Sequence, residues 1–265
     1  MLISDETVQT AAALPVLETG AEEAWNPTKE FQTNVVGVSF QDAYDQAARF
    51  LNYIDSKTPL KENNRILDYG CGWGRMLKLL RMTPGFSAIE LHGCDVNVYA
   101  LEVVRKTIPH VYVAKCEPWP PTIYRDGSFS LIYAFSVFSH LREDAHIAWA
   151  KELARLTRPG GHAAITVQGA AYMKMCADFR SGATPRTHAW HEDMAASPFG
   201  TPEAAARYAA GEFLSFESLS PQIDKSYGEA LVPRSYLEST WGALGFDLID
   251  WDETHGQNWA VLKRR

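Results

Sequence analysis

The sequence has few cysteines and no long hydrophobic run. Its 265 residues include 4 cysteines, and none of them forms a C-x-x-C pair or a zinc-ligand spacing. A disulfide framework is therefore not expected, and no metal site is predicted. The longest strongly apolar stretch, residues 131–138, is far too short to span a bilayer. These absences argue against a disulfide-rich secreted protein and against a membrane protein.

The sequence also lacks an excess of positive charge. Lys and Arg number 25 and Asp and Glu number 32, which gives a net charge of −7. Such a chain has no electrostatic basis for binding a nucleic-acid backbone, so nucleic acid is not an expected partner. Residues 1–20 are mixed polar and acidic and do not resemble a signal peptide. We therefore expect a reduced, cytoplasmic protein that does not associate with membranes.

The composition and length are those of a globular α/β domain with extra elements. Hydrophobic residues make up 46% of the chain and charged residues 22%, close to the globular average. Pro15, Gly20 and Pro27 interrupt the N-terminal region, so residues 1–33 are expected to be irregular. Apolar residues at helical spacing then predict an amphipathic helix over residues 39–54.

Short apolar runs and amphipathic segments alternate along the middle of the chain. Strands are predicted at residues 65–69, 92–95, 110–116, 129–136 and 162–167, with helices at 74–81, 99–108 and 143–157 between them. Repeated strand–helix–strand units indicate a parallel sheet with right-handed crossovers. The alternation breaks over residues 169–233, where one helix is predicted at 202–210, and it resumes with a helix at 234–244 and strands at 246–252 and 257–263. The turn between the last two strands is too short for a crossover, so they must be antiparallel.

A glycine-rich loop at residues 65–75 carries the main functional signal. Gly70, Gly72 and Gly74 follow a buried strand at alternate positions and lead into a helix. Such glycines allow a sharp turn and let a ligand lie against the backbone amides of the helix N-terminus. Arg75 occupies the place where the dinucleotide fingerprint G-x-G-x-x-G needs its third glycine, which disfavours a nicotinamide or flavin cofactor.

Two acidic residues complete the motif. Asp68 lies two residues before the first glycine and adds a carboxylate that can hold an ammonium group. Asp95 closes the next predicted strand 27 residues later. An acid at that strand end is placed to accept hydrogen bonds from both hydroxyls of a ribose.

The loop, the two acids and the segment Arg158-Pro159-Gly160-Gly161 together resemble the class I S-adenosylmethionine-dependent methyltransferases. The resemblance covers residues 65–167 by motif and 234–265 by topology. It implies a Rossmann-like α/β fold: a seven-stranded, mostly parallel sheet with an antiparallel last strand and helices on both faces. We predict an N-terminal helical cap at residues 1–60 and a methyltransferase domain at 61–265, with a lid insertion at about 169–233.

The resemblance also implies the cofactor and the residues that contact it. The cofactor is S-adenosylmethionine, which leaves as S-adenosylhomocysteine. The positions expected to contact it are Asp68, Gly70, Cys71, Gly72, Trp73, Asp95, Val96, Glu117, Phe135 and Ser136. Glu117 stands where many relatives have an Asp that binds the adenine amino group, so it is the expected substitute. Segments 70–75 and 135–141 further resemble a bacterial subset associated with cell-surface polysaccharides and secondary metabolites.

The predicted reaction is methyl transfer to a small-molecule or saccharide acceptor, at a hydroxyl oxygen. Such a transfer needs a group that removes the hydroxyl proton, and histidine titrates in the right range. His140 follows the fourth strand, where this fold directs the transferred methyl group, and it is the expected base. His255, in the final turn, lies at the same edge by topology and is the second candidate.

Other interpretations of these features stay open. His140 can instead cap the following helix, and the chain can instead be a nicotinamide-dependent oxidoreductase or a non-catalytic protein that binds the cofactor. The oligomeric state is not predicted. Arg75, Lys78 and Arg81 share one helix face that is expected to be solvated. His146 is expected on the surface of its helix, and the cysteines are expected to pack as small apolar residues.

Overall fold

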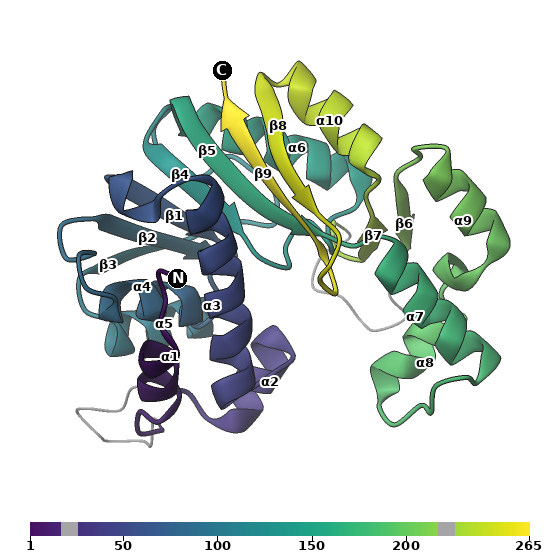
Figure 1. The fold of residues 1–265 in the computed structure, drawn as a ribbon, viewed down its shortest axis with the longest axis horizontal. Coiled ribbons are helices and arrows are strands. Elements are labelled where there is room, and N and C mark those ends of the chain that lie inside the picture. Colours follow the sequence, from purple (N-terminus) through teal and green to yellow (C-terminus); the bar gives the residue numbers. More distant parts are fainter. Residues whose placement is uncertain (17–25, 217–225) are drawn as a thin grey trace. The chain divides into compact units, whose positions relative to one another are not determined.

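The structure, a computed structural model, describes residues 1–16, 26–216 and 226–265, and it divides into two compact units (Figure 1). The first unit comprises Met1–Glu117, Pro121–Ala134 and Leu156–His162. The second comprises Pro118–Pro120, Phe135–Arg155 and Ala163–Arg265. No helix in the described ranges combines the length and apolar character needed to cross a membrane.

Seven strands form the main sheet in the order β3-β2-β1-β4-β5-β9-β8. Their bounds are β1 Arg65–Tyr69, β2 Glu90–Asp95, β3 Val111–Lys115, β4 Phe129–Ala134, β5 Thr157–Val167, β8 Phe246–Asp252 and β9 Asn258–Arg264. β1 pairs in parallel with β2 and β4, β2 pairs in parallel with β3, and β8 is antiparallel to β9. The predicted seven-stranded, mostly parallel sheet is confirmed. The strand order reverses between β1 and β4, which is where ligands bind in open α/β sheets, outside the carboxyl ends of the strands.

Two helices occupy residues 5–12 and 29–36, so the expectation of an irregular stretch through residue 33 is wrong for these positions. The N-terminal region contains α1 Asp5–Ala12, α2 Lys29–Val36 and α3 Phe40–Lys57. The Ser4 side chain accepts a hydrogen bond from the Thr7 amide at the start of α1, and Thr28 caps α2 in the same way. Pro15 and Pro27 lie between α1 and α2, so they separate the two helices without preventing either, and Gly20 lies outside the described residues. The helix predicted at 39–54 is confirmed as α3.

The first unit also contains η1 Leu60–Glu62, α4 Arg75–Met82 and α5 Val98–Thr107. Arg75 and Lys78 on α4 are buried, so the expected solvated face is wrong. The reason is tertiary, because α1 and α3 pack against α4. Burial lowers the pKa of Lys78 to about 7, and its Nζ lies 3.2 Å from Oδ1 of Asn26.

The second unit holds α6 Glu143–Leu156, α10 Arg234–Ala243 and an insertion that is richer than the single helix predicted for it. The described elements of the insertion are α7 Ala170–Ser181, α8 Ala189–Ala196, η2 Pro198–Gly200, α9 Pro202–Ala209, β6 Leu214–Phe216 and β7 Glu229–Leu231 (Figure 1). They share a buried cluster that includes Cys176, Phe179, Met194, Phe199 and Leu214. Many of the insertion's apolar residues therefore pack within it. Residues 217–225, which the predicted lid includes, lie outside the described residues.

Pro159, Gly160 and Gly161 lie inside β5, which begins at Thr157 rather than at the predicted residue 162. The helix predicted at 143–157 is confirmed as α6, which ends at Leu156, directly before this strand. Gly160 has φ +75°, so one residue of this strand adopts a left-handed conformation that glycine tolerates best.

His146 is fully buried, so its expected surface position is wrong. Its Nε2 accepts a hydrogen bond from Nε1 of Trp241 on α10 at 3.2 Å, and Phe138 packs edge-on against its ring. Burial lowers the pKa of His146 to about 3. The imidazole is therefore a neutral core group that joins α6 to α10.

We expect His146 to make the protein less stable in mild acid. A pKa that is lower in the folded state than in the unfolded state stabilises the fold above about pH 6.5, and this contribution is lost as the pH falls through that value toward 3. Urea unfolding should therefore show the free energy of unfolding falling more between pH 7 and pH 5 in the wild type than in His146→Gln. His110→Asn is the control, because His110 is exposed with φ +58°, which Asn tolerates. The same pH dependence in wild type and His146→Gln would contradict the assignment.

Candidate active site

The glycine loop follows β1 and turns the backbone into α4. Gly70, Gly72 and Gly74 have φ values of +75°, +52° and +83°, in the left-handed region that side chains rarely adopt. The amides of Gly70 and Cys71 both donate to the carbonyl of Cys94, at 2.8 and 3.1 Å. The loop is thereby tied to the end of β2, and its backbone amides lie at the N-terminus of α4.

Asp95, at the end of β2, is bound directly to the glycine loop. Its Oδ2 accepts from the Gly72 amide and its Oδ1 from the Asn97 amide, both at 2.8 Å. Burial raises the pKa of Asp95, and the hydrogen bonds from these amides oppose the rise. Each carboxylate oxygen has two lone pairs, so both keep acceptor capacity after these bonds. This is the chemistry that a pair of sugar hydroxyls requires.

Asp68 lies within β1, only 3% exposed. Burial raises its pKa to about 8, while Tyr133 and Arg75 act in the opposite direction. A bound ammonium group would favour the ionised carboxylate and lower the pKa again.

Helix α2 packs on the glycine loop, which the sequence did not indicate. A Cβ atom built on Gly72 would lie 3.1 Å from Cγ1 of Val35 and 3.7 Å from Cγ1 of Val36. Trp73 is fully buried and packs edge-on against Tyr44 of α3. The N-terminal helices therefore contact this loop directly.

The remaining predicted cofactor positions of the first unit differ in accessibility. Cys71 is buried, whereas Val96 is 47% exposed. The side chain of Glu117 is 67% exposed, and Oε1 lies 2.7 Å from Nζ of Lys115. Cys71, Cys94, Cys116 and Cys176 are buried and free, as expected for packing residues. In the described part of the chain, no group of three or more His, Cys, Asp or Glu residues has an arrangement suited to a metal ion.

The second unit resumes at Phe135, directly after β4, in a strained turn. Ser136 has φ +58°, which is rare for a residue with a side chain. Its amide donates to Oγ1 of Thr166 at 2.7 Å, and its Oγ accepts from Nε2 of Gln257 at 3.0 Å. Phe135 packs edge-on against Trp259. Gln257, from the β8–β9 turn, was not singled out in the sequence.

The imidazole of His140 lies in a polar cluster of the same unit. Its Nδ1 is 3.2 Å from Oε1 of Glu229, and its Nε2 is 3.5 Å from Oγ of Ser136. Its ring stacks on Tyr227 with centroids 5.1 Å apart and planes 12° apart. Burial lowers the pKa of His140, but Glu229 and the backbone of Gly228 raise it, and the net result is above the ordinary value.

Glu229 is the residue of this cluster that the sequence analysis missed. It begins β7 in the insertion, 89 positions after His140, and no local motif marks it. Tertiary pairing brings the two together: the Gly228 amide donates to the His140 carbonyl at 2.8 Å, and the Ala230 amide donates to the Ser139 carbonyl at 2.9 Å. The insertion therefore contributes a charged residue to the surroundings of His140.

His255 lies in the β8–β9 turn and has different neighbours. Its ring stacks on Trp259 with centroids 3.4 Å apart, and its Nε2 is 3.5 Å from Oδ2 of Asp252. The structure thus groups His140 with Ser136 and Glu229, and it groups His255 with Trp259.

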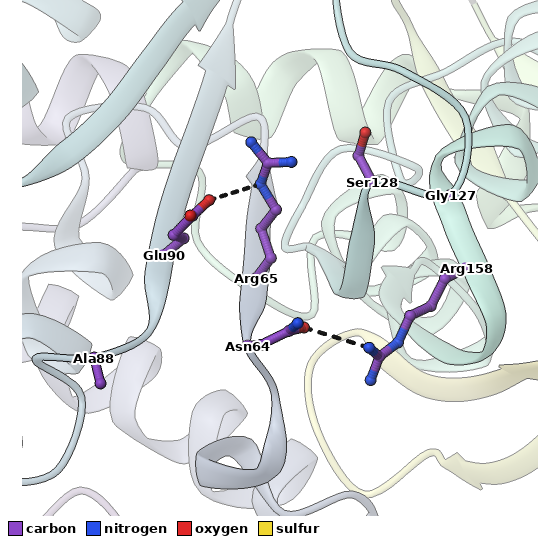
Figure 2. Close-up of a pocket in the computed structure, with 7 residues that line it drawn as sticks. All are labelled: Asn64, Arg65, Ala88, Glu90, Gly127, Ser128 and Arg158. Atoms are coloured by element: carbon purple, nitrogen blue, oxygen red, sulfur yellow. Dashed lines mark hydrogen bonds and ion pairs between the residues drawn. The ribbon is translucent and has the colours of Figure 1, made fainter.

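A cavity of about 480 Å³ also opens in the first unit, at the amino-terminal ends of β1 and β2 (Figure 2). It is lined by Asn64, Arg65, Ala88, Glu90, Gly127, Ser128 and Arg158. Nε of Arg65 forms an ion pair with Glu90 at 2.9 Å, and Arg158 reaches toward Asn64. The glycine loop leaves the other end of β1, and none of the predicted site residues lines this cavity. It is therefore separate from the candidate active site.

A parallel sheet with this strand order, a glycine loop after β1 and an acid at the end of β2 define the class I methyltransferase fold. Residues 40–249 match the family described as "Methyltransferase domain". The match covers most of the chain, and the protein belongs to this family. The methyl donor of this family is S-adenosylmethionine, which is the cofactor expected from the sequence. A comparison with curated proteins finds no match.

Several solved structures share the fold at low sequence identity. An S-adenosylmethionine-dependent methyltransferase from Mesorhizobium loti is 14% identical with a TM-score of 0.58, over 83% of this chain and 100% of that one. S-adenosylmethionine-bound CalS10, an amino pentose methyltransferase from Micromonospora echinaspora, is 14% identical with a TM-score of 0.54, over 92% and 100%. An O-methyltransferase family protein from Burkholderia thailandensis is 14% identical with a TM-score of 0.54, over 84% and 57%.

The bond between Asp95 and Gly72 can be tested without any ligand. Removing the carboxylate in Asp95→Ala should speed hydrogen exchange of the Gly72 amide about tenfold or more, because a hydrogen bond to a charged group contributes roughly 1.5–3 kcal/mol. Asp95→Asn should give an intermediate rate, since its side-chain oxygen can still accept one amide. Glu102→Gln, at an exposed ion pair on α5, is the control. Unchanged protection of Gly72 in Asp95→Ala would show that the loop does not depend on this bond.

Proposed function

We propose that the protein transfers a methyl group from S-adenosylmethionine to a hydroxyl oxygen of a small-molecule or saccharide acceptor, with His140 accepting the hydroxyl proton. The observation that carries the proposal is the position of the His140 imidazole. His140 follows β4, and its ring lies close to Ser136 of the same segment and to Glu229 of β7. The family supplies the reaction class, and the side chains of this cluster supply the chemistry that a hydroxyl acceptor needs.

The first unit has the features required to hold the cofactor. The left-handed glycines keep side chains away from the turn at the start of α4, and the amides of Gly70 and Gly72 hold the loop against Cys94 and Asp95 at the end of β2. In the proposal, Asp95 binds the ribose hydroxyls and Asp68 holds the ammonium group. When bound, S-adenosylmethionine supplies a methyl group already activated on a sulfonium. The protein's own task is to hold the acceptor, exclude water and take up one proton.

His140 suits that task because a carboxylate lies beside one of its nitrogens. Oε1 of Glu229 is 3.2 Å from Nδ1 without hydrogen-bond geometry, and its negative charge favours the proton of the neutral imidazole on Nδ1, which leaves the lone pair on Nε2. A hydroxyl donating to Nε2 becomes a better nucleophile as its proton moves to the imidazole. The pKa of His140, raised above its ordinary value, keeps the base within reach of neutral pH.

The alternatives from the sequence find less support. A nicotinamide-dependent oxidoreductase does not agree with the family match or with Arg75 at the third glycine position. The solved neighbours include an amino pentose methyltransferase and an O-methyltransferase family protein, and these titles agree with a saccharide or other hydroxylated acceptor. The same proposal includes cofactor contacts by Val96, Glu117 and Phe135. It also includes His255 as the second candidate for the base.

Cofactor binding is tested by calorimetry with S-adenosylhomocysteine. Asp95→Ala should weaken binding by about 10- to 100-fold, because it removes charge-assisted hydrogen bonds of roughly 1.5–3 kcal/mol each. This variant is preferable to a larger residue at Gly72, which would also collide with Val35. Glu102→Gln should bind as the wild type does, and NAD should not bind measurably to either protein. Wild-type affinity in Asp95→Ala would overturn the assignment of the ribose site.

The role of His140 is tested by turnover with hydroxylated acceptors, measured as S-adenosylhomocysteine formed. His140→Ala should lower the rate by about 10²–10⁴ while cofactor affinity stays constant. Because the base must be neutral and its pKa is raised, the wild-type rate should rise with pH through a value above 6.5, and the variant should lose this limb. His255→Ala should reduce the rate less and act mainly on acceptor binding. Near-normal turnover in His140→Ala would exclude it as the base.

A further inference from the structure

Glu229 is the charged partner of His140, and it comes from the insertion rather than from the sheet that carries the glycine loop. We propose that Glu229 is a positioning residue that fixes the tautomer and orientation of His140 and thereby makes Nε2 the proton acceptor. This inference rests on the proposed function of His140 and extends it to a residue that no motif identifies. It gives the insertion a part in catalysis beyond the covering role predicted from the sequence.

The carboxylate of Glu229 is held from several sides. Nε2 of Gln168 donates a hydrogen bond to Oε2, and the carboxylate adds to the rise that burial causes in the pKa of Tyr172 on α7. Gln168, which follows β5, is only 3% exposed, and its carbonyl accepts from the Val232 amide at 3.0 Å. With Oε2 engaged, Oε1 is the oxygen that faces Nδ1 of His140 at 3.2 Å. The position of the carboxylate is therefore set independently of His140.

On its other sides, the imidazole contacts uncharged groups. Tyr227 stacks flat on one face of the ring, and the Ser136 hydroxyl lies 3.5 Å from Nε2. Of these three neighbours in the described part of the chain, Glu229 is the one that carries a negative charge. A proton held on Nδ1 by the negative charge of Glu229 leaves Nε2 unprotonated beside the Ser136 hydroxyl. A carboxylate that fixes a histidine in this way works by selecting one tautomer and by stabilising the imidazolium that forms.

The carboxylate also sets the pH range in which His140 can act. Burial alone lowers the pKa of this histidine, and Glu229 reverses that effect. Removing the charge while keeping the shape, as in Glu229→Gln, should therefore drop the pKa of His140 below its ordinary value. The base would then be neutral over a wider pH range but would be weaker and less well oriented. A structural ion pair would show the same change in the pKa of His140, so a fall in turnover at constant cofactor affinity is what separates a positioning role from a structural one.

NMR titration of the His140 imidazole in the complete protein tests the inference without relying on activity. We expect the wild type to titrate above 6.5 with the proton of the neutral form on Nδ1, and Glu229→Gln to titrate below 6.5 with mixed tautomers. Turnover in Glu229→Gln should fall about 10- to 100-fold, its acidic limb should move to lower pH, and its affinity for S-adenosylhomocysteine should not change. Glu229→Asp, which keeps the charge, should restore part of the rate and of the pKa. Glu238→Gln, at an exposed ion pair on α10, is the matched control and should behave as the wild type does.

The two levels of the proposal fail in different ways. An unchanged pKa and tautomer of His140 in Glu229→Gln would overturn the role of Glu229, even if His140→Ala is inactive. A shifted pKa combined with full turnover in His140→Ala would overturn the proposed base, and with it the catalytic part of the inference. Urea unfolding shows whether Glu229→Gln is still folded. If it is not, Glu229→Asp is used instead, and its His140 pKa must lie between 6.5 and the wild-type value. A value outside this range would overturn the inference.

Discussion

The bond between the Gly72 amide and the Asp95 carboxylate is the constraint on which the candidate cofactor site depends. It links the loop that leaves β1 to the residue that ends β2, and the parallel pairing of these strands brings the two within 2.8 Å. The same carboxylate accepts from Asn97 at the start of α5, so one side chain fixes the loop and the next helix together. Withdrawing a carboxylate partly from water is costly unless such donors surround it, and here the backbone provides them. The acid proposed to bind the ribose is therefore also the acid that shapes the loop.

The second unit builds its polar site in a different way, from segments distant in the sequence. His140 comes from the loop after β4, Glu229 from β7 and Gln257 from the β8–β9 turn. The insertion provides both Glu229 and Tyr227, while its own helices are packed around an apolar cluster. A stably packed insertion can hold a carboxylate at a defined distance from an imidazole, which an irregular loop would not do.

The N-terminal helices show how tertiary packing overrides a local pattern. Arg75 and Lys78 look like an ordinary charged helix face, yet α1 and α3 cover them. Arg75 donates to the carbonyl of Ala43 and to Oε1 of Gln46, so the guanidinium is satisfied by α3 rather than by water. Lys78 has its amine beside Asn26, and its pKa falls because the charge is desolvated. In consequence, the helix that follows the glycine loop is anchored to the N-terminal region.

The sequence by itself determined the sheet, its antiparallel end and the cofactor motif. These depend on short-range patterns: the alternation of strands and helices, the spaced glycines and an acid such as Asp95 at a strand end. Only the tertiary structure decided the helices before residue 33, the folding of the insertion, the burial of His146 and the pairing of His140 with Glu229. The physical reason is that capping and long-range packing fix these features. A contact between residues 89 positions apart leaves no periodic trace in one sequence.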